Sequence, residues 1–151
     1  MENRQGCLVA ALLAGDVGVI AHQANCFNTM ASGVAKVIRE CLPEAYAADL
    51  RTTKGDKSKL GKYSMAASHG GLVFNLYGQF DYGRREGWVY TRIEELAKSL
   101  RAMDAALFQR GYSGKIGLPK LGCGLGGADW DEVEQLIRDT LHDYEVIIYT
   151  L

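Results

Sequence analysis

The chain has 151 residues but only two prolines, and it contains no long apolar run. Scarce proline beside eighteen glycines disfavours a disordered or linker-rich chain and is typical of an α/β domain with tight loops. The apolar stretch 8–13 is too short to cross a bilayer, and the polar residues before it do not resemble a signal peptide. We therefore expect one domain over residues 1–151, located in the cytoplasm, with no membrane partner.

Cysteine is also sparse, and its spacing is informative. The four cysteines are Cys7, Cys26, Cys41 and Cys123. They form no Cys-x-x-Cys pair and have no histidine at zinc-finger distance, which disfavours a structural metal site. Free thiols in a reducing compartment are expected. Cys26 and Cys123 have no evident base beside them in the sequence, so we interpret them as small buried thiols rather than nucleophiles.

The chain also lacks an excess of positive or negative charge. The chain has 17 lysines and arginines against 18 aspartates and glutamates, a net charge of −1. No global basic field attracts nucleic acid or an anionic membrane, so any anion site must be local. The stretch 51–62 holds five cationic residues against Asp56 alone. Short charge runs of this kind are usually surface segments, and we expect a solvated connector.

The pattern of apolar residues predicts alternating strands and helices. Strands are expected within residues 1–8 and over 17–22, 63–68, 72–77, 115–118 and 144–151, with helices over 9–14, 34–41, 43–50, 91–110 and 129–141. The strands 63–68 and 72–77 form a hairpin around His69 and Gly70. Capping boxes are predicted at two helix starts, by Thr91 with Glu94 and by Asp129 with Glu132. The order indicates an α/β fold: a mixed, mostly parallel sheet with helices on both faces, in three α/β/α layers.

Two of the predicted strands end in loops suited to a ligand. The strand 17–22 ends at His22 and Asn25, and the strand 115–118 leads into a loop with Gly122, Gly124 and Gly126. In such sheets ligands lie beyond the carboxyl ends of the strands. Backbone N–H groups of a glycine loop beside a helix N-terminus suit phosphate oxygens. Residues 30–34 supply a second set of donors, so the two loops are expected to clamp a diphosphate.

Four separated segments resemble the macrodomain family. They are residues 22–26 (His-Gln-Ala-Asn-Cys) with 30–35 (Met-Ala-Ser-Gly-Val-Ala), residues 75–83, residues 118–130 (Leu-Pro-Lys-Leu-Gly-Cys-Gly-Leu-Gly-Gly-Ala-Asp-Trp), and residues 146–151. They resemble the branch that holds phage and yeast ADP-ribose-1''-phosphate phosphatases and terminal ADP-ribose protein glycohydrolase. The resemblance covers nearly the whole chain.

The resemblance implies an ADP-ribose site. No metal-ligand cluster is visible in the sequence, so we expect neither a metal nor a cofactor. The ligand-binding residues that the resemblance implies are Cys7, Leu8, Asn25, Met30, Ala31, Ser32, Gly33, Val34, Gln79, Phe80, Pro119, Lys120, Leu121, Gly122, Cys123, Gly124, Leu125 and Gly126. His22 is the candidate general acid or base. Asn25 is the candidate for orienting the distal ribose or a water molecule. Lys120 either pairs with a terminal phosphate or is a solvated loop residue.

Three departures from the family pattern bear on function. Cys7 stands where an aspartate usually binds the adenine amine, although Asp16 is an alternative match. Ala31 replaces a common glycine. The glycohydrolases of this branch use a lysine near residues 77–79 and an acid in the second loop, where this chain has Gln79 and Gly126. The pattern therefore favours the phosphatase members.

We expect a monomeric, metal-independent enzyme that hydrolyses ADP-ribose-1''-phosphate to ADP-ribose and phosphate, in the host cytoplasm if the gene is a phage's. Two alternatives stay open. One is an ADP-ribose-binding module without catalysis. The other is a hydrolase that removes ADP-ribose from protein or nucleic acid, so that ADP-ribosylated macromolecules are partners.

Overall fold

A single six-stranded sheet runs through the computed structural model, which describes residues 1–151. The strands are β1 (Glu2–Gln5), β2 (Val19–Gln23), β3 (Tyr63–Ser68), β4 (Gly71–Leu76), β5 (Lys115–Leu118) and β6 (Glu145–Thr150). Their order across the sheet is β1-β6-β5-β2-β4-β3, and every neighbouring pair is parallel except the antiparallel pair of β3 and β4. This arrangement confirms the mixed, mostly parallel sheet and the predicted hairpin.

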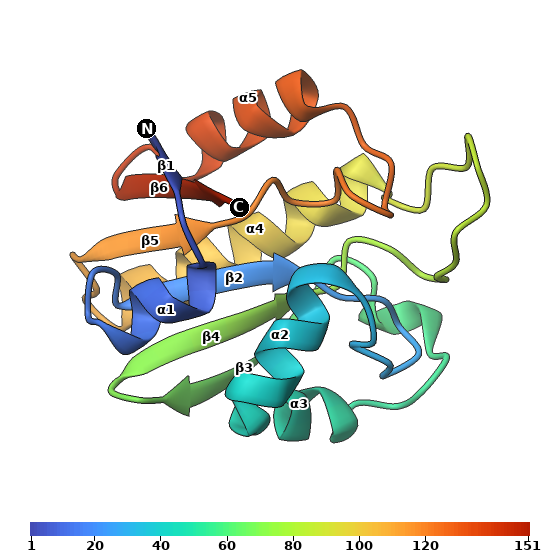
Figure 1. Cartoon of the computed structure of the whole chain (residues 1–151), viewed down its shortest axis with the longest axis horizontal. Helices are drawn as coiled ribbons and strands as arrows, with labels where there is room; N and C mark the ends of the chain where they lie inside the picture. Colours follow the sequence, from blue (N-terminus) through green and yellow to red (C-terminus); the bar gives the residue numbers. More distant parts are fainter.

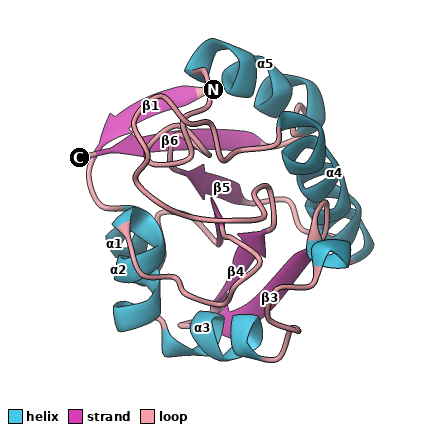
Figure 2. Cartoon of the chain, turned by 90° about the vertical axis from the view of Figure 1, so that its right-hand side faces the viewer, coloured by secondary structure: helices cyan, strands magenta, loops and turns pink.

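Helices cover both faces of this sheet. Three helices, α1 (Leu8–Leu13), α2 (Gly33–Cys41) and α3 (Pro43–Leu50), lie on one face, and α4 (Ile93–Gln109) and α5 (Trp130–Thr140) lie on the other (Figures 1 and 2). A buried apolar cluster fills each interface, one of 16 residues under α4 and α5 and one of 13 under α1 and α2. The predicted three layers are therefore confirmed.

None of these helices combines the length and the apolar character that crossing a bilayer requires.

The predicted helix starts are only partly confirmed. Pro43 occupies the first turn of α3, where its missing N–H costs nothing. Asp129 is the N-cap of α5, but its side chain caps no backbone N–H. The capping box on Thr91 is wrong, because α4 has Arg92 as its N-cap and the Thr91 hydroxyl instead donates to the Gly122 carbonyl at 2.9 Å. Tertiary contact has taken the hydroxyl away from the helix.

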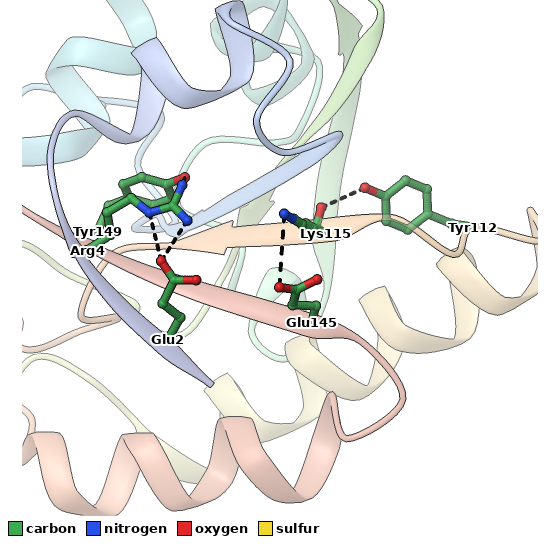
Figure 3. A network of polar contacts seen from close by, with 6 residues as sticks. All are labelled: Glu2, Arg4, Tyr112, Lys115, Glu145 and Tyr149. Atoms are coloured by element: carbon green, nitrogen blue, oxygen red, sulfur yellow. Dashed lines mark hydrogen bonds and ion pairs between the residues drawn. The ribbon is translucent and has the colours of Figure 1, made fainter.

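The edge strand β1 is held mainly by its backbone pairing with β6. Figure 3 shows the polar contacts on this part of the sheet. The Arg4 guanidinium donates to Glu2 at 2.8 Å and to the Tyr149 hydroxyl at 3.5 Å, and the Lys115 ammonium lies 4.0 Å from the Glu145 carboxylate. The charged partners are solvent-accessible, and exposed pairs of this kind contribute little to stability.

A buried polar network ties α3 to the sheet. The His22 Nε2 atom lies 2.6 Å from the Asn75 carbonyl oxygen, and the Asn75 amide donates to the Ala45 carbonyl and to the Ser64 hydroxyl. These two donations fix the Asn75 amide, so the neutral His22 ring donates from Nε2. Nδ1 of His22 has no partner. Ser64 continues the chain of bonds to the Tyr77 hydroxyl at 2.7 Å.

The network ends at a buried carboxylate, and a buried ammonium lies on the neighbouring 3₁₀ helix. The Tyr77 hydroxyl donates to the Asp49 carboxylate at 2.6 Å, and burial raises the pKa of both groups. Lys59, on the 3₁₀ helix η1 (Lys57–Lys59), is only 6% exposed, and its ammonium donates to the Cys26 carbonyl and to the Asn28 side chain. The predicted solvated connector is therefore wrong at Lys59, which pins the loop after β2.

The buried imidazole makes stability depend on pH. Burial lowers the pKa of His22 to about 4, against an ordinary value of 6.5. Below about pH 6.5 the unfolded chain binds a proton that the folded chain does not. The free energy of unfolding should therefore fall as the pH drops from 6.5 to 4, by at most about 1.4 kcal/mol per pH unit.

The variant His22→Gln should lose this component, because its amide can still donate to Asn75 but does not titrate. Urea titrations of both proteins at half-unit steps between pH 4.5 and 7.5 measure the difference. Parallel pH profiles for the two proteins would contradict the buried, uncharged His22.

Candidate functional site

One pocket opens at the sheet edge where the parallel strands end. Its volume is about 570 Å³. It is lined by residues 22–25, 29–35, 79, 82–84, 119–122 and 124–126. These segments follow β2, precede and begin α2, follow β4, and follow β5. The predicted ligand loops, far apart in sequence, therefore meet at one cavity.

The loop before α2 is shaped by its own polar side chains. The Asn25 carbonyl oxygen accepts from the Phe27 backbone N–H at 2.8 Å, and its amide donates to the Thr29 hydroxyl at 2.7 Å. The helix then begins at Gly33, with Ser32 as an N-cap whose side chain makes no capping bond. The first-turn N–H groups of α2 therefore remain without a side-chain acceptor at the pocket wall, where the helix dipole favours an anion.

The opposite wall is a loop that has no room for side chains at two positions. Gly122 has a φ of +70°, and a Cβ there would lie 2.6 Å from the Thr91 hydroxyl oxygen. A Cβ on Gly126 would lie 2.6 Å from the Gly122 carbonyl oxygen. The Gly126 carbonyl also accepts from the backbone N–H groups of Tyr90 and Thr91. Glycine at 126 is thus required by packing in this loop.

A single side-chain amide joins three of the pocket's segments. The Gln23 amide nitrogen donates to the side-chain carbonyl oxygen of Gln79 at 2.7 Å and to the Thr91 hydroxyl at 2.8 Å. Thr91 passes the contact on to Gly122. The Gln79 amide donates onward to the Asp81 carbonyl at 2.8 Å. Gln23 therefore sets the distance between the loop after β4 and the glycine loop.

The pocket is lined by cations but by no carboxylate. Its ionisable lining residues are His22, Tyr82, Arg84 and Lys120. The Lys120 ammonium lies 5.6 Å from the centre of the Trp130 ring, and its side chain is exposed at the pocket wall. His22 is uncharged at neutral pH because of its burial. The arrangement is suited to a negatively charged ligand.

The thiols near the pocket are poor nucleophiles. Burial raises the pKa of Cys26 to about 11, and burial also raises the pKa of Cys123. The Cys26 thiol donates to the backbone carbonyl of Gln79, and the Cys123 thiol donates to the backbone carbonyl of Leu121. Since only the thiolate attacks, both side chains are structural at neutral pH.

Most of the predicted site residues line this cavity. They are His22, Asn25, Met30, Ala31, Ser32, Gly33, Val34, Gln79, Pro119, Lys120, Leu121, Gly122, Gly124, Leu125 and Gly126. Four others do not. Leu8 is buried in the core. The centres of the Phe80 and Phe27 rings lie 5.0 Å apart, and the Cys123 thiol donates to the Leu121 carbonyl. Cys7 is the exposed N-cap of α1.

The topology distinguishes the two candidates for an adenine contact. Cys7 follows the carboxyl end of β1, which runs parallel to β6, β5 and β2. It therefore lies at the same sheet edge as the pocket. Asp16 precedes β2 and so lies at the opposite edge. Of the two residues, Cys7 is the one at the pocket's end of the strands.

Sequence reasoning missed several lining residues. They are Gln23, Ala24, Thr29, Ala35, Tyr82, Gly83 and Arg84. Gln23 and Ala24 lie inside the segment 22–26, whose other residues resemble the first ligand loop of the family. Tyr82 and Gly83 lie inside the segment 75–83, which also carries the resemblance, whereas Arg84 lies just beyond it.

The Gln23 contacts predict a matched pair of outcomes. In Gln23→Ala the Thr91 hydroxyl and the Gln79 carbonyl lose a donor, so the free energy of unfolding should fall by about 1–3 kcal/mol. Gln135→Ala is the control, because the Gln135 amide makes one exposed bond to Asp139 on α5. That variant should stay within about 0.5 kcal/mol of the parent. Chemical denaturation measures both, and equal losses would contradict the joining role of Gln23.

Comparison with known sequences identifies relatives of two kinds. The sequence profile described as "Macro domain" matches residues 21–137. A phage T4 protein, an "uncharacterized 17.5 kDa protein in tk-vs intergenic region", is 33% identical over 134 residues, which is 85% of this chain and 83% of that protein. The DNA ADP-ribosyl glycohydrolase of Thermus aquaticus is 27% identical over 135 residues, which is 89% of this chain but only 37% of that protein.

Solved structures share the fold. A Bacteroides thetaiotaomicron protein of unknown function superposes with a TM-score of 0.82, at 22% identity, over 99% of this chain and 97% of that chain. Thermosipho africanus DarTG in complex with ADP-ribose gives 0.74 at 18% identity, over 99% of this chain and 41% of that chain. With the profile covering most of the sequence and the phage relative covering nearly all of it, this chain belongs to the macrodomain family.

Proposed function

We propose that this macrodomain binds ADP-ribose in the pocket and hydrolyses the bond between the distal ribose and a group attached at its C1'' position. One observation carries the proposal: two backbone loops face each other across a cavity that has cations and no carboxylate in its lining. The T. africanus protein, which shares this fold over 41% of its chain, was solved in complex with ADP-ribose. Water would supply OH to one side of the cleaved bond and H to the other.

The diphosphate would lie between the start of α2 and the glycine loop. Backbone N–H groups near Gly33 and Gly124 would donate to its oxygens from the two sides. Lys120 and Arg84 would offset its negative charge. Asn25 and Gln79 would border the distal ribose, where the bond to be cleaved begins.

The specific substrate that we propose is ADP-ribose-1''-phosphate, which the enzyme would hydrolyse as a phosphatase. The pocket favours it, because an additional phosphate would meet cations rather than carboxylates. Phosphoryl transfer depends mainly on positioning and charge stabilisation, which needs no strong base. His22 would act as a weak base, since its ring is neutral and its Nδ1 has no partner, but this atom is buried in the free protein and the ligand or its water would have to reach it. Asn25 would orient the water.

The second candidate is removal of ADP-ribose from a macromolecule. The Thermus aquaticus and Mycobacterium tuberculosis relatives are named DNA ADP-ribosyl glycohydrolases, and this chain spans 37% and 40% of their lengths. That chemistry would have to proceed here without a lysine at Gln79 or an acid at Gly126.

Binding can be tested separately from catalysis with two glycines of the same geometry. Gly33 and Gly70 both have positive φ and open space where a Cβ would be, but Gly70 lies in the β3–β4 turn at the opposite edge. Gly33→Glu places a carboxylate at the start of α2 and should weaken ADP-ribose binding at least about tenfold, or 1.4 kcal/mol. Gly70→Glu carries the same backbone strain and should not. Calorimetry decides, and equal affinities for the two variants would refute the diphosphate position.

Catalysis is tested with a panel of three substrates. ADP-ribose-1''-phosphate, a single-stranded oligonucleotide with one ADP-ribosylated base, and mono-ADP-ribosylated protein are each incubated with the chain. Release of ADP-ribose is followed by chromatography. Turnover of at least one is expected, with a loss of roughly a hundredfold or more in His22→Gln while ADP-ribose still binds. Binding of ADP-ribose with no turnover of any substrate would leave a binding module.

A further inference from the structure

A second hollow opens at the edge of the sheet where β5 and β6 begin (Figure 1). Its volume is about 670 Å³, and it is lined by residues 104–105 and 108–109 at the end of α4, 111–113 before β5, and 143–144 before β6. The pocket described above lies where the parallel strands end, and the two cavities share no lining residue. The second hollow is therefore a separate feature of the surface.

Two tyrosine rings form a fixed part of the second hollow. The rings of Tyr112 and Tyr144 stack, with their centres 6.1 Å apart and their planes at 29°. The Tyr112 hydroxyl donates to the Lys115 carbonyl at 2.6 Å (Figure 3). A Cβ at Gly18 or Gly114 would lie 2.6 or 2.5 Å from the Tyr112 hydroxyl oxygen, so glycine at both positions leaves the space that the phenol needs. The aromatic surface is thus in place before anything binds.

The second hollow is negatively charged. Asp104 and Asp143 line it, and no lysine or arginine does. Asp104 forms no salt bridge, and the ionic contact of Asp143 is with the Nδ1 atom of His142 at 3.1 Å. Burial raises the pKa of Tyr144, and the carboxylates of Asp104 and Asp143 raise it further, so both charges act on the tyrosine pair. Two carboxylates beside aromatic rings are suited to a cation.

A large exposed side chain at the rim indicates that the cation belongs to a polypeptide. Phe108 lines the second hollow and is 81% exposed. A small free cation between the carboxylates would leave this ring in water, whereas the residues beside a charged side chain can cover it. Arginine fits better than lysine, because its flat guanidinium can stack on a tyrosine and pair with a carboxylate at the same time.

We propose that the second hollow binds an arginine side chain from a basic segment of a partner protein. The guanidinium lies against the Tyr112 and Tyr144 rings and pairs with Asp104 and Asp143, and apolar residues beside the arginine cover Phe108. This inference goes beyond the proposed function and does not depend on it. A partner that docks here leaves the ADP-ribose pocket open, because the two cavities lie at opposite ends of the strands.

The test uses two capped synthetic peptides, Leu-Gly-Arg-Gly-Leu and the same sequence with citrulline in place of arginine. Citrulline keeps the shape of the side chain but has no charge. The backbone amide signals of residues 111–113 and 143–144 are followed by NMR during titration. The arginine peptide should shift them with saturation, and the citrulline peptide should bind at least about tenfold more weakly. Equal shifts with the two peptides, or shifts that do not saturate, would overturn the proposal.

Three variants locate the contact. Asp104→Asn and Phe108→Ala should each weaken binding of the arginine peptide at least about fivefold and leave the affinity for ADP-ribose unchanged. Asp131→Asn is the matched control, because Asp131 is an exposed carboxylate in the first turn of α5 and does not line the second hollow. Equal affinities in Asp104→Asn and Asp131→Asn would contradict the site. Free ethylguanidinium that binds as tightly as the peptide would overturn the assignment to a protein partner.

Discussion

The geometry of the pocket depends on one amide group. Gln23 donates from the carboxyl end of β2 to Gln79 and to Thr91, and Thr91 in turn holds the Gly122 carbonyl. A strand in the middle of the sheet is the most rigid support that this fold offers. Two loops, the connection between β4 and α4 and the glycine loop after β5, are therefore bonded to the end of this strand directly or through Thr91. This contact fixes the position of the glycine loop relative to the loop after β4, whereas the wall before α2 is held separately by the Asn25 side chain.

The same corner explains why the pocket is cationic at its rim and neutral at its base. Side-chain amides and a hydroxyl occupy the positions closest to β2, and burial keeps His22 uncharged. Charges are confined to Lys120 and Arg84, which remain in contact with water. Neutral groups at the base avoid the cost of burying an unpaired ion. Cations at the rim attract an anion without that cost.

Local sequence pattern was enough to predict the order of strands and helices, the hairpin and the two ligand loops. Those features depend on residues within a few positions of each other. It failed where long-range contacts decide. Thr91 has the sequence of a cap, yet its partners are 31 and 68 positions away. Lys59 has the sequence of a surface residue, yet it satisfies carbonyl groups of the loop after β2. Arg84 lies beyond the segment 75–83, and it lines the pocket because the irregular segment that carries it is bonded to the glycine loop at Gly126.

The two departures from the glycohydrolase pattern are consequences of one packing arrangement. A side chain at 126 would collide with the Gly122 carbonyl, and both ends of the Gln79 amide already have partners. A Cβ at Gly78 would meet the Gln23 amide. An acid at 126 would require the Gly122 and Thr91 contacts to move, and a lysine at 79 would give up the bonds that join Gln79 to Gln23 and Asp81. The hydrolysis proposed for this pocket would therefore use a positioned water and the charge at the rim rather than a lysine adduct.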